Sequence, residues 1–365
     1  MVPAIAGRIP LVRRPKAAGL PLAERITHLT ALTVEPAGAG HHDLVARASG
    51  VLNYAALIAS DVGMPDLAAE LCWRQHRVFA EARTLSPDIA VMSLMPLINI
   101  SRLLTREGNG EGAYDLLLRL YRAAQRRETA TIHGHDVDLS ALIRTEADHR
   151  KISEELWVSV LVDGARALAR IGRWTEAAEA MTAHRGVGNR LLDGRQIVIM
   201  SLMERGLDQQ ARATIESTTP TEPWENSVAT LLRISCRPQT SPTPQPELDH
   251  ALREALALVS PPDPATAAFQ ARVGLSALDL ARNRTGPCVA LLRDAVADVA
   301  MLDAYAARDV LNHSLTHSQL TNAQRQKLNA VLAASGLDAG SLSTDHSQAL
   351  TTAAGKAEDA LHRLL

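Results

Sequence analysis

The sequence from Leu156 to Ala183 reads LWVSVLVDGARALARIGRWTEAAEAMTA. Its first half keeps an apolar stripe at three- and four-residue spacing, which is typical of one face of an α-helix, with Leu156, Val160, Leu161, Leu168 and Ile171. Gly172 follows the stripe, where the residue just past a helix end commonly adopts a left-handed conformation. A second helix is expected from Trp174. The stretch therefore predicts an antiparallel helical hairpin.

The same turn recurs as a glycine followed five residues later by a small residue, with apolar helices on both sides. Four pairs satisfy this rule: Gly63 with Ala68, Gly108 with Ala113, Gly172 with Ala177, and Gly206 with Ala211. The glycine ends one helix in a left-handed conformation, and the alanine lets the next helix approach closely. The last two glycines lie 34 residues apart.

Residues 172–177, Gly-Arg-Trp-Thr-Glu-Ala, resemble the turn of a tetratricopeptide repeat, whose period is also 34 residues. The resemblance covers about residues 50–220 and, more loosely, 247–335. In style the chain is similar to the helical-repeat proteins abundant in actinobacteria. The resemblance implies an all-α fold, a right-handed α-solenoid of antiparallel helical hairpins.

Composition agrees with a helical fold and narrows the class of protein. The chain has 365 residues, a formal charge of -2 and only 3% aromatic residues, so Leu, Ala, Val and Ile must fill the core. The balanced charge gives no overall attraction to nucleic acid or to a membrane surface. The three cysteines, Cys72, Cys236 and Cys288, form no CxxC pair and are expected to be buried thiols. With no signal peptide and no apolar window of membrane-spanning length found, a cytoplasmic protein is expected.

Breaks in helical periodicity predict four regions. Residues 1–20, interrupted by Pro3, Pro10 and Pro15, are expected to be a flexible arm. Residues 21–236 are expected to be the repeats, with an insertion at 127–150 that alternates weakly around Gly134 and could be a small hairpin or a loop. A proline-rich linker is expected at 237–246, followed by C-terminal helical repeats at 247–365. Helices are expected near 42–62, 247–259, 265–282, 287–302, 304–316, 321–335 and 345–364.

Two arginine pairs suggest a binding groove. Arg102 and Arg106 are four residues apart near the end of one helix, Arg166 and Arg170 repeat the arrangement, and residues at this spacing share a helix face. By resemblance, a concave groove for an acidic peptide segment would be formed by Asn53, Asn99, Arg102, Arg106, Asp163, Arg166, Arg170 and Gln196. The alternative is that these arginines only complement helix dipoles and stay solvated.

A second basic feature is the loop from His184 to Arg195. Arg185, Arg190 and Arg195, with the backbone amides of a helix start, could hold an anion. Neither a Walker loop nor a strand-linked dinucleotide fingerprint is present. An ordinary turn between repeats is the competing interpretation.

Neither a metal site nor a catalytic motif is predicted. His133, His135, Asp136 and Asp138 are potential ligands, but their spacing matches neither a helical zinc motif nor a zinc finger. We expect no metal and no cofactor. A GxSxG motif and the kinase signatures are absent from the sequence.

The leading hypothesis is a non-catalytic scaffold or adaptor that binds a protein or peptide partner, without direct binding to nucleic acid or membrane. Two alternatives remain open. One is an accessory protein or enzyme of a biosynthetic pathway with a small-molecule cavity, with the arginines of the 184–195 loop at its mouth. The other is a regulatory peptide sensor.

Overall fold

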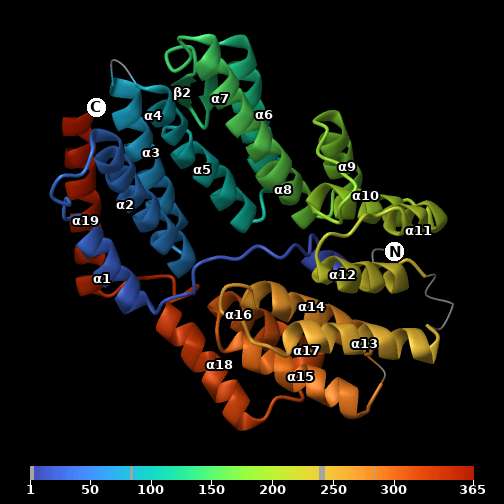
Figure 1. Cartoon of the computed structure of the whole chain (residues 1–365). Coiled ribbons are helices and arrows are strands. Elements are labelled where there is room, and N and C mark those ends of the chain that lie inside the picture. Colours follow the sequence, from blue (N-terminus) through green and yellow to red (C-terminus); the bar gives the residue numbers. More distant parts are fainter. Residues whose placement is uncertain (1–3, 83–84, 238–242, 283) are drawn as a thin grey trace. The chain divides into compact units, whose positions relative to one another are not determined.

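The computed structural model describes residues 4–82, 85–237, 243–282 and 284–365, and it is predominantly helical (Figure 1). Within these ranges the only strands are β1 (Thr129–Ile132) and β2 (His135–Asp138). The predicted all-α class is therefore confirmed.

The described chain forms two compact units, and neither is continuous in sequence. Unit 1 contains residues 4–20 and 172–337, and unit 2 contains residues 21–171 and 338–365. The elements of unit 2 are α1 (Leu22–Leu32), α2 (His41–Val62), α3 (Pro65–Glu81), α4 (Pro87–Met92), α5 (Met95–Arg106), α6 (Gly110–Arg126), β1, β2, α7 (Glu146–Ser159), the π-helical turn η2 (Val160–Gly164), α8 (Ala165–Arg170) and α19 (Thr344–Leu364).

Unit 1 contains the remaining elements. They are the 3₁₀ turn η1 (Ala4–Arg8), α9 (Trp174–Ala183), α10 (Asp193–Glu204), α11 (Asp208–Glu216), α12 (Pro223–Ser235), α13 (Gln245–Val259), α14 (Ala267–Leu280), α15 (Pro287–Ala300), α16 (Ala304–Asn312), α17 (Ser314–His317) and α18 (Asn322–Ser335). The helices expected near 247–259, 265–282, 287–302 and 321–335 are present with bounds shifted by at most two residues, while the one expected at 304–316 is divided into α16 and α17.

The four predicted glycine turns are confirmed in conformation. Their glycines have φ between 71° and 88°, and the alanines five residues later are fully buried. Within the units, the turns at Gly63, Gly108 and Gly206 join helices that pack on each other: α2 on α3, α5 on α6, and α10 on α11. Small residues at these contacts allow the helix backbones to approach closely.

The fourth turn differs from expectation in what it connects. The boundary between the units falls between Ile171 and Gly172. Within unit 2, α8 packs on α6, and within unit 1, α9 packs on α10. The two halves of the predicted 156–183 hairpin thus belong to different units.

The last helix, α19, belongs to unit 2 and not with the other helices of the predicted C-terminal region. Within unit 2, α19 packs on α1, α2 and α3 and adds Leu350 and Leu361 to their core, as the red and blue helices of Figure 1 show. The N–H groups of Asp338 and Gly340 donate to the carbonyls of Asp61 and Val62 over 2.8 and 2.7 Å. Because the last carbonyls of a helix lack intrahelical partners, this returning chain completes the end of α2. Residues 338–365 therefore do not belong with residues 247–337, and the expected extent of the C-terminal repeats, 247–365, is wrong.

The 127–150 insertion contains an antiparallel β-hairpin, one of the two forms that its alternation allowed. Thr129 pairs with Asp138 and Ile132 with His135, around a turn in which both His133 and Gly134 have positive φ. Its apolar residues join the core of unit 2, with Ala130, Ile132, Val137 and Leu139 buried. The insertion is part of that core.

Residues 4–20 are not the flexible arm that their prolines suggested. Ile5, Ile9 and Leu11 are buried, and Leu11 is 1% exposed. Burial of these apolar side chains in unit 1 offsets part of the conformational entropy that the segment loses on being ordered. In the expected linker, residues 238–242 lie outside the described residues. Before them α12 ends at Ser235, and after them α13 begins at Gln245.

One segment, Pro87–Arg106, has the length and apolar composition of a membrane span, although the sequence was expected to contain none. In the structure it comprises α4 and α5, and 56% of the apolar window is buried inside the protein. Ile89, Leu97 and Ile98 belong to the core of unit 2. A core helix satisfies the same length and composition criterion.

Candidate functional site

One cavity of unit 2 lies among α2, α3 and α5 and has a volume of about 410 Å³. We call it the α2–α5 pocket. Its lining residues are Gly50, Asn53, Tyr54, Ala56, Leu57, Ser60, Cys72, Met95, Asn99, Arg102, Leu103 and Arg106. Four of the eight residues predicted to form a groove are in this set: Asn53, Asn99, Arg102 and Arg106.

Helical spacing explains why these residues meet. On α5, Asn99, Arg102 and Arg106 recur at three- and four-residue intervals, and on α2 Asn53, Leu57 and Ser60 do the same. Side chains at these intervals lie on one helix face. The two faces line one cavity, and α3 contributes Cys72 to it.

A chain of hydrogen bonds joins the polar side chains along one edge of the pocket. The Asn99 amide donates to Asn53 Oδ1 over 3.2 Å, and Arg102 Nη1 donates to Asn99 Oδ1 over 3.1 Å. Arg102 then makes a two-pronged contact with Asp163, with Nε and Nη2 lying 3.2 and 3.0 Å from its two carboxylate oxygens. The predicted groove residue Asp163 is thereby brought to the side of Arg102.

Arg106 is held by a second cluster at the other end of the same helix face. Its Nη1 lies 2.8 Å from Asp61 Oδ1, and Arg25 Nη2 lies 2.8 Å from Asp61 Oδ2. Asp61 is buried, so its carboxylate fixes two guanidinium groups in place. The sequence analysis did not identify either Asp61 or Arg25.

The apolar side of the pocket is formed mainly by Leu57, Met95 and Leu103. Leu57 is 44% exposed, so its side chain is accessible from the pocket opening. Cys72 is buried, and burial raises the pKa of its thiol to about 12. A thiol with so high a pKa is a poor nucleophile, in keeping with the packing role expected for it.

The remaining predicted groove residues lie elsewhere. Arg166 and Arg170 are on α8 and are not among the residues that line the pocket. Gln196 is in unit 1, where it is fully buried on α10. Its side-chain amide is bonded to the backbone of Leu11 and Leu191, so Gln196 is a buried structural residue and not the exposed groove residue that was expected.

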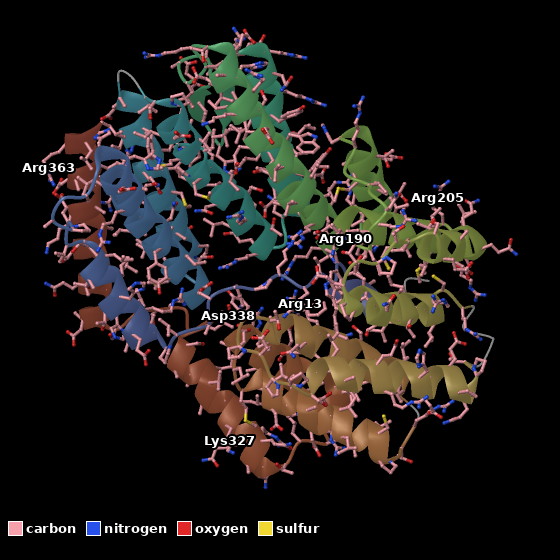
Figure 2. The ribbon with its side chains drawn as sticks, viewed as in Figure 1. Arg13, Arg190, Arg205, Lys327, Asp338 and Arg363 are labelled. Atoms are coloured by element: carbon pink, nitrogen blue, oxygen red, sulfur yellow. The ribbon has the colours of Figure 1, made fainter. Side chains whose placement is uncertain are left out.

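Two of the three predicted anion-binding arginines hold the fold together. Arg195 is buried and donates to the carbonyls of Thr214 and Gly188 over 2.9 and 3.0 Å. Arg190, labelled in Figure 2, contacts Glu225 and Glu222 over 2.7 and 3.0 Å. Arg185 is exposed at the end of α9. The loop therefore fits the alternative interpretation, an ordinary structural turn, better than an anion site.

Glu225 shows how firmly this loop is fixed. Its carboxyl is fully buried and accepts hydrogen bonds from Arg190 and from the backbone N–H groups of Leu191, Thr221 and Glu222. Burial by itself raises the pKa of Glu225, but these hydrogen bonds outweigh it and lower that pKa from 4.5 to about 2. The charge of Arg190 is thus paired with glutamates of unit 1.

Three of the four side chains considered as metal ligands have other partners. His135 stacks on Trp73 with ring centroids 3.9 Å apart, Asp136 accepts from Thr131, and Asp138 accepts from Ser140. Among the described residues, no group of three or more His, Cys, Asp or Glu side chains could hold a metal ion.

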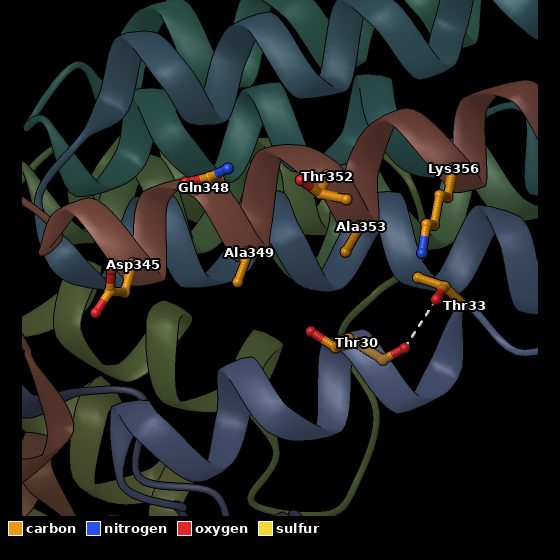
Figure 3. Close-up of a pocket in the computed structure, with 8 residues that line it drawn as sticks. All are labelled: Thr30, Thr33, Asp345, Gln348, Ala349, Thr352, Ala353 and Lys356. Carbon is orange, nitrogen blue, oxygen red and sulfur yellow. Dashed lines mark hydrogen bonds between the residues drawn. The ribbon is translucent and has the colours of Figure 1, made fainter.

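A second hollow of about 300 Å³ lies between α1 and α19 of unit 2 (Figure 3). Thr30, Thr33, Thr352 and Lys356 line its sides, together with Ala349 and Ala353. The Thr33 hydroxyl is already used in a 2.8 Å hydrogen bond to the carbonyl of Thr30. Its lining has no large apolar side chain comparable to Leu57 or Met95 of the α2–α5 pocket.

Sequence analysis missed most of the apolar wall of the α2–α5 pocket. Leu57 follows Asn53 by four residues and therefore shares its helix face, a signal that was present in the sequence. Met95 and Cys72 carry no such signal, since apolar residues on a helix are usually core residues.

Comparisons of the chain with family models, with curated proteins and with solved structures find no significant match.

Proposed function

We propose that this chain is a non-catalytic helical-repeat protein that binds a peptide segment of a partner protein, and that the α2–α5 pocket receives an apolar side chain of that segment. The observation that carries the proposal is the combination of an apolar wall with amide and guanidinium groups at one opening. Ligand sites commonly combine a mostly apolar surface with a few fixed polar groups that orient the ligand.

The order of helices in unit 2 supports a repeat architecture similar to tetratricopeptide repeats. Two hairpins, α2 with α3 and α5 with α6, follow each other, and α3 packs on α5. Each hairpin turns at a left-handed glycine, followed five residues later by a buried alanine. Stacked hairpins of this kind present one helix of each pair to a common surface. In this proposal that surface is the one on α2 and α5.

The polar groups favour a segment that carries an acidic residue beside its apolar one. The side chains of Arg102 and Arg106 are 49% and 39% exposed even with their carboxylate contacts. Guanidinium groups offer five N–H donors in a planar fork, so a side chain paired with one carboxylate can still contact another. The neighbouring amides of Asn53 and Asn99 are suited to the peptide backbone.

Selection from a displayed random peptide library tests this proposal while the partner is still unidentified. We expect the selected sequences to share an apolar residue with an aspartate or glutamate close to it. Leu57→Glu should weaken their binding by about tenfold or more, because it places a charge on the apolar wall. Arg102→Gln should weaken it by about 10- to 100-fold, the value of a hydrogen bond to a charged group.

Leu291→Glu provides the matched control, since Leu291 is 57% exposed on α15 of unit 1 and does not line the pocket. It should leave the binding of the selected peptides unchanged. Peptides that bind equally well to wild type and to Leu57→Glu would assign recognition to another surface.

The pocket volume also fits a small molecule, as the alternative function of a biosynthetic accessory protein or enzyme requires. Native mass spectrometry on protein purified from its own cells distinguishes the two functions. A bound small ligand that is lost from Leu57→Glu and retained by Leu291→Glu would favour the small-molecule function. Because Arg190 and Arg195 are engaged in unit 1, the cavity mouth first expected at these arginines is no longer part of that alternative.

A further inference from the structure

Residues 9–16 follow η1 in unit 1 as an extended segment without helix or strand (Figure 1). Together with Arg8, the last residue of η1, they read Arg-Ile-Pro-Leu-Val-Arg-Arg-Pro-Lys, with four basic side chains and no acidic one. Two apolar side chains, Ile9 and Leu11, are buried, whereas residues 13–16 are exposed. The segment thus contacts the unit as a peptide contacts a binding groove, with apolar anchors followed by charged contacts.

One buried side chain recognises the backbone of this segment. Gln196 on α10 accepts the N–H of Leu11 at Oε1 over 2.7 Å, and its Nε2 donates to the carbonyl of Leu11 over 2.8 Å. The same amide nitrogen also donates to the carbonyl of Leu191, 2.8 Å away, which fixes the orientation of the side chain. A side-chain amide that satisfies both backbone groups of one residue holds an extended chain whatever side chain that residue bears.

Each basic side chain of the segment meets an aspartate from a different part of unit 1. The pairs are Arg8 with Asp279 at 2.6 Å, Arg13 with Asp263 at 3.6 Å, Arg14 with Asp193, and Lys16 with Asp303 at 2.7 Å. Arg13 is labelled in Figure 2. Three of the four carboxylates are nearly buried, and only that of Asp263 is well exposed. The aspartates come from the start of α10, the loop before α14, the end of α14 and the start of α16.

Some of these carboxylates are fixed independently of the segment. Asp303 caps α16 by accepting the N–H of Ala306 over 3.0 Å, and Asp263 accepts the N–H of Ala265 and the hydroxyl of Thr266. Asp279 also contacts His313, with Oδ1 and Nε2 3.1 Å apart. Carboxylates held by their own local partners stay in position when an opposing cation leaves, so the groove is organised in advance.

We propose that this groove of unit 1 is a binding site for an extended basic segment of a partner protein, and that residues 8–16 occupy it as an intramolecular ligand. The partner segment would carry a leucine-like side chain in the place of Leu11, with basic side chains two, three and five residues later. It would enter only by displacing the chain's own segment. This site is separate from the α2–α5 pocket and does not depend on the function proposed for it.

Covalent attachment determines how strongly the segment competes. A tethered ligand has an effective concentration on the order of millimolar, and we expect the free segment to bind with a dissociation constant on the order of micromolar. A free peptide should therefore bind the intact chain on the order of 100-fold or more weaker than it binds a chain whose segment can leave.

The test inserts a protease recognition sequence between Ala17 and Ala18, which are exposed. The probe is a fluorescent synthetic peptide of residues 4–17, AIAGRIPLVRRPKA. After cleavage, fluorescence anisotropy should report micromolar binding that unlabelled peptide competes away, and binding to the uncleaved chain should be on the order of 100-fold weaker or more. Peptides with Leu11→Asp, or with Arg13, Arg14 and Lys16 all changed to Glu, should lose tenfold or more.

A second measurement leaves the chain uncut. Changing Arg13, Arg14 and Lys16 to Glu in the full chain should place repulsive charges opposite the aspartates and make binding of the unaltered probe about tenfold tighter or more than in wild type. Two results would overturn the proposal by making the segment an integral part of the core. One is that the probe fails to bind either chain at about 100 times the expected dissociation constant. The other is that circular dichroism shows the chain unfolding after cleavage. Dimerisation of the intact chain in light scattering would assign the groove to a second copy, and would overturn it equally.

Discussion

Glycines in this chain are required for two different physical reasons. Gly108 has φ of +84°, and a side chain at this position would meet nothing within 4 Å, so only its backbone conformation favours glycine. Gly110, two residues later, begins α6, and a Cβ there would lie 2.2 Å from the carbonyl oxygen of Ala167 on α8. The second requirement is steric and involves backbone on both sides.

Gly110→Ala should therefore destabilise unit 2 more than Gly108→Ala. A left-handed alanine costs about 1 to 2 kcal/mol, whereas an added methyl that must separate two packed backbones is expected to cost about 3 kcal/mol. Chemical denaturation of the two variants and wild type measures the difference. Equal losses for the two variants would mean that separating α8 from α6 costs no more than a left-handed alanine.

At the scale of single elements, the β-hairpin shows how an apparent insertion becomes part of a core. From the sequence, residues 127–150 were expected to be an insertion between the repeats. In the structure, buried and exposed residues alternate along β1, and the buried residues of β1 and β2 belong to the core of unit 2. Neighbouring residues of one strand should therefore contribute very different amounts to the free energy of unfolding.

Ile132→Ala and Thr131→Ala are adjacent substitutions on opposite faces of β1. Ile132 is 2% exposed, so its truncation should cost about 2 to 5 kcal/mol through lost burial and the cavity left behind. Thr131 is exposed, and its loss should cost less than about 1 kcal/mol. Thermal or urea unfolding gives both values. A peripheral hairpin would instead show two small and similar losses.

At the scale of the whole molecule, each unit is assembled from distant parts of the chain. Residues 338–365 belong with 21–171, although α18, which precedes them, packs on α15 and α16 of unit 1. Two features fix this assignment: the hydrogen bonds of Asp338 and Gly340 to the end of α2, and the burial of Leu361 against the helices of unit 2.

Leu361→Ala and Leu328→Ala test this assignment, because both side chains are fully buried and lie on the last two helices. Each should cost about 2 to 5 kcal/mol. In hydrogen exchange followed by mass spectrometry, Leu361→Ala should speed exchange in α1, α2 and α3, and Leu328→Ala in α15 and α16. Faster exchange in α15 and α16 for both variants would contradict the assignment of α19 to unit 2.

Local sequence was sufficient for the elements. The glycine turns, the buried alanines after them and most helix bounds follow from backbone preference and apolar periodicity, which depend on neighbours within a few residues. The gathering of Asn99, Arg102 and Arg106 on one face of α5 is of the same kind, because helical geometry alone places them together.

Associations between distant segments were decided only by the tertiary structure. Proline spacing made residues 1–20 look unstructured, yet Leu11 is buried because Gln196, far along the chain, satisfies both of its backbone groups. In the same way, α19 completes unit 2 because the returning chain satisfies the carbonyls at the end of α2. The burial and hydrogen bonds that stabilise these segments come from partners that are remote in sequence. Periodicity within one segment carries no information about where its partner lies.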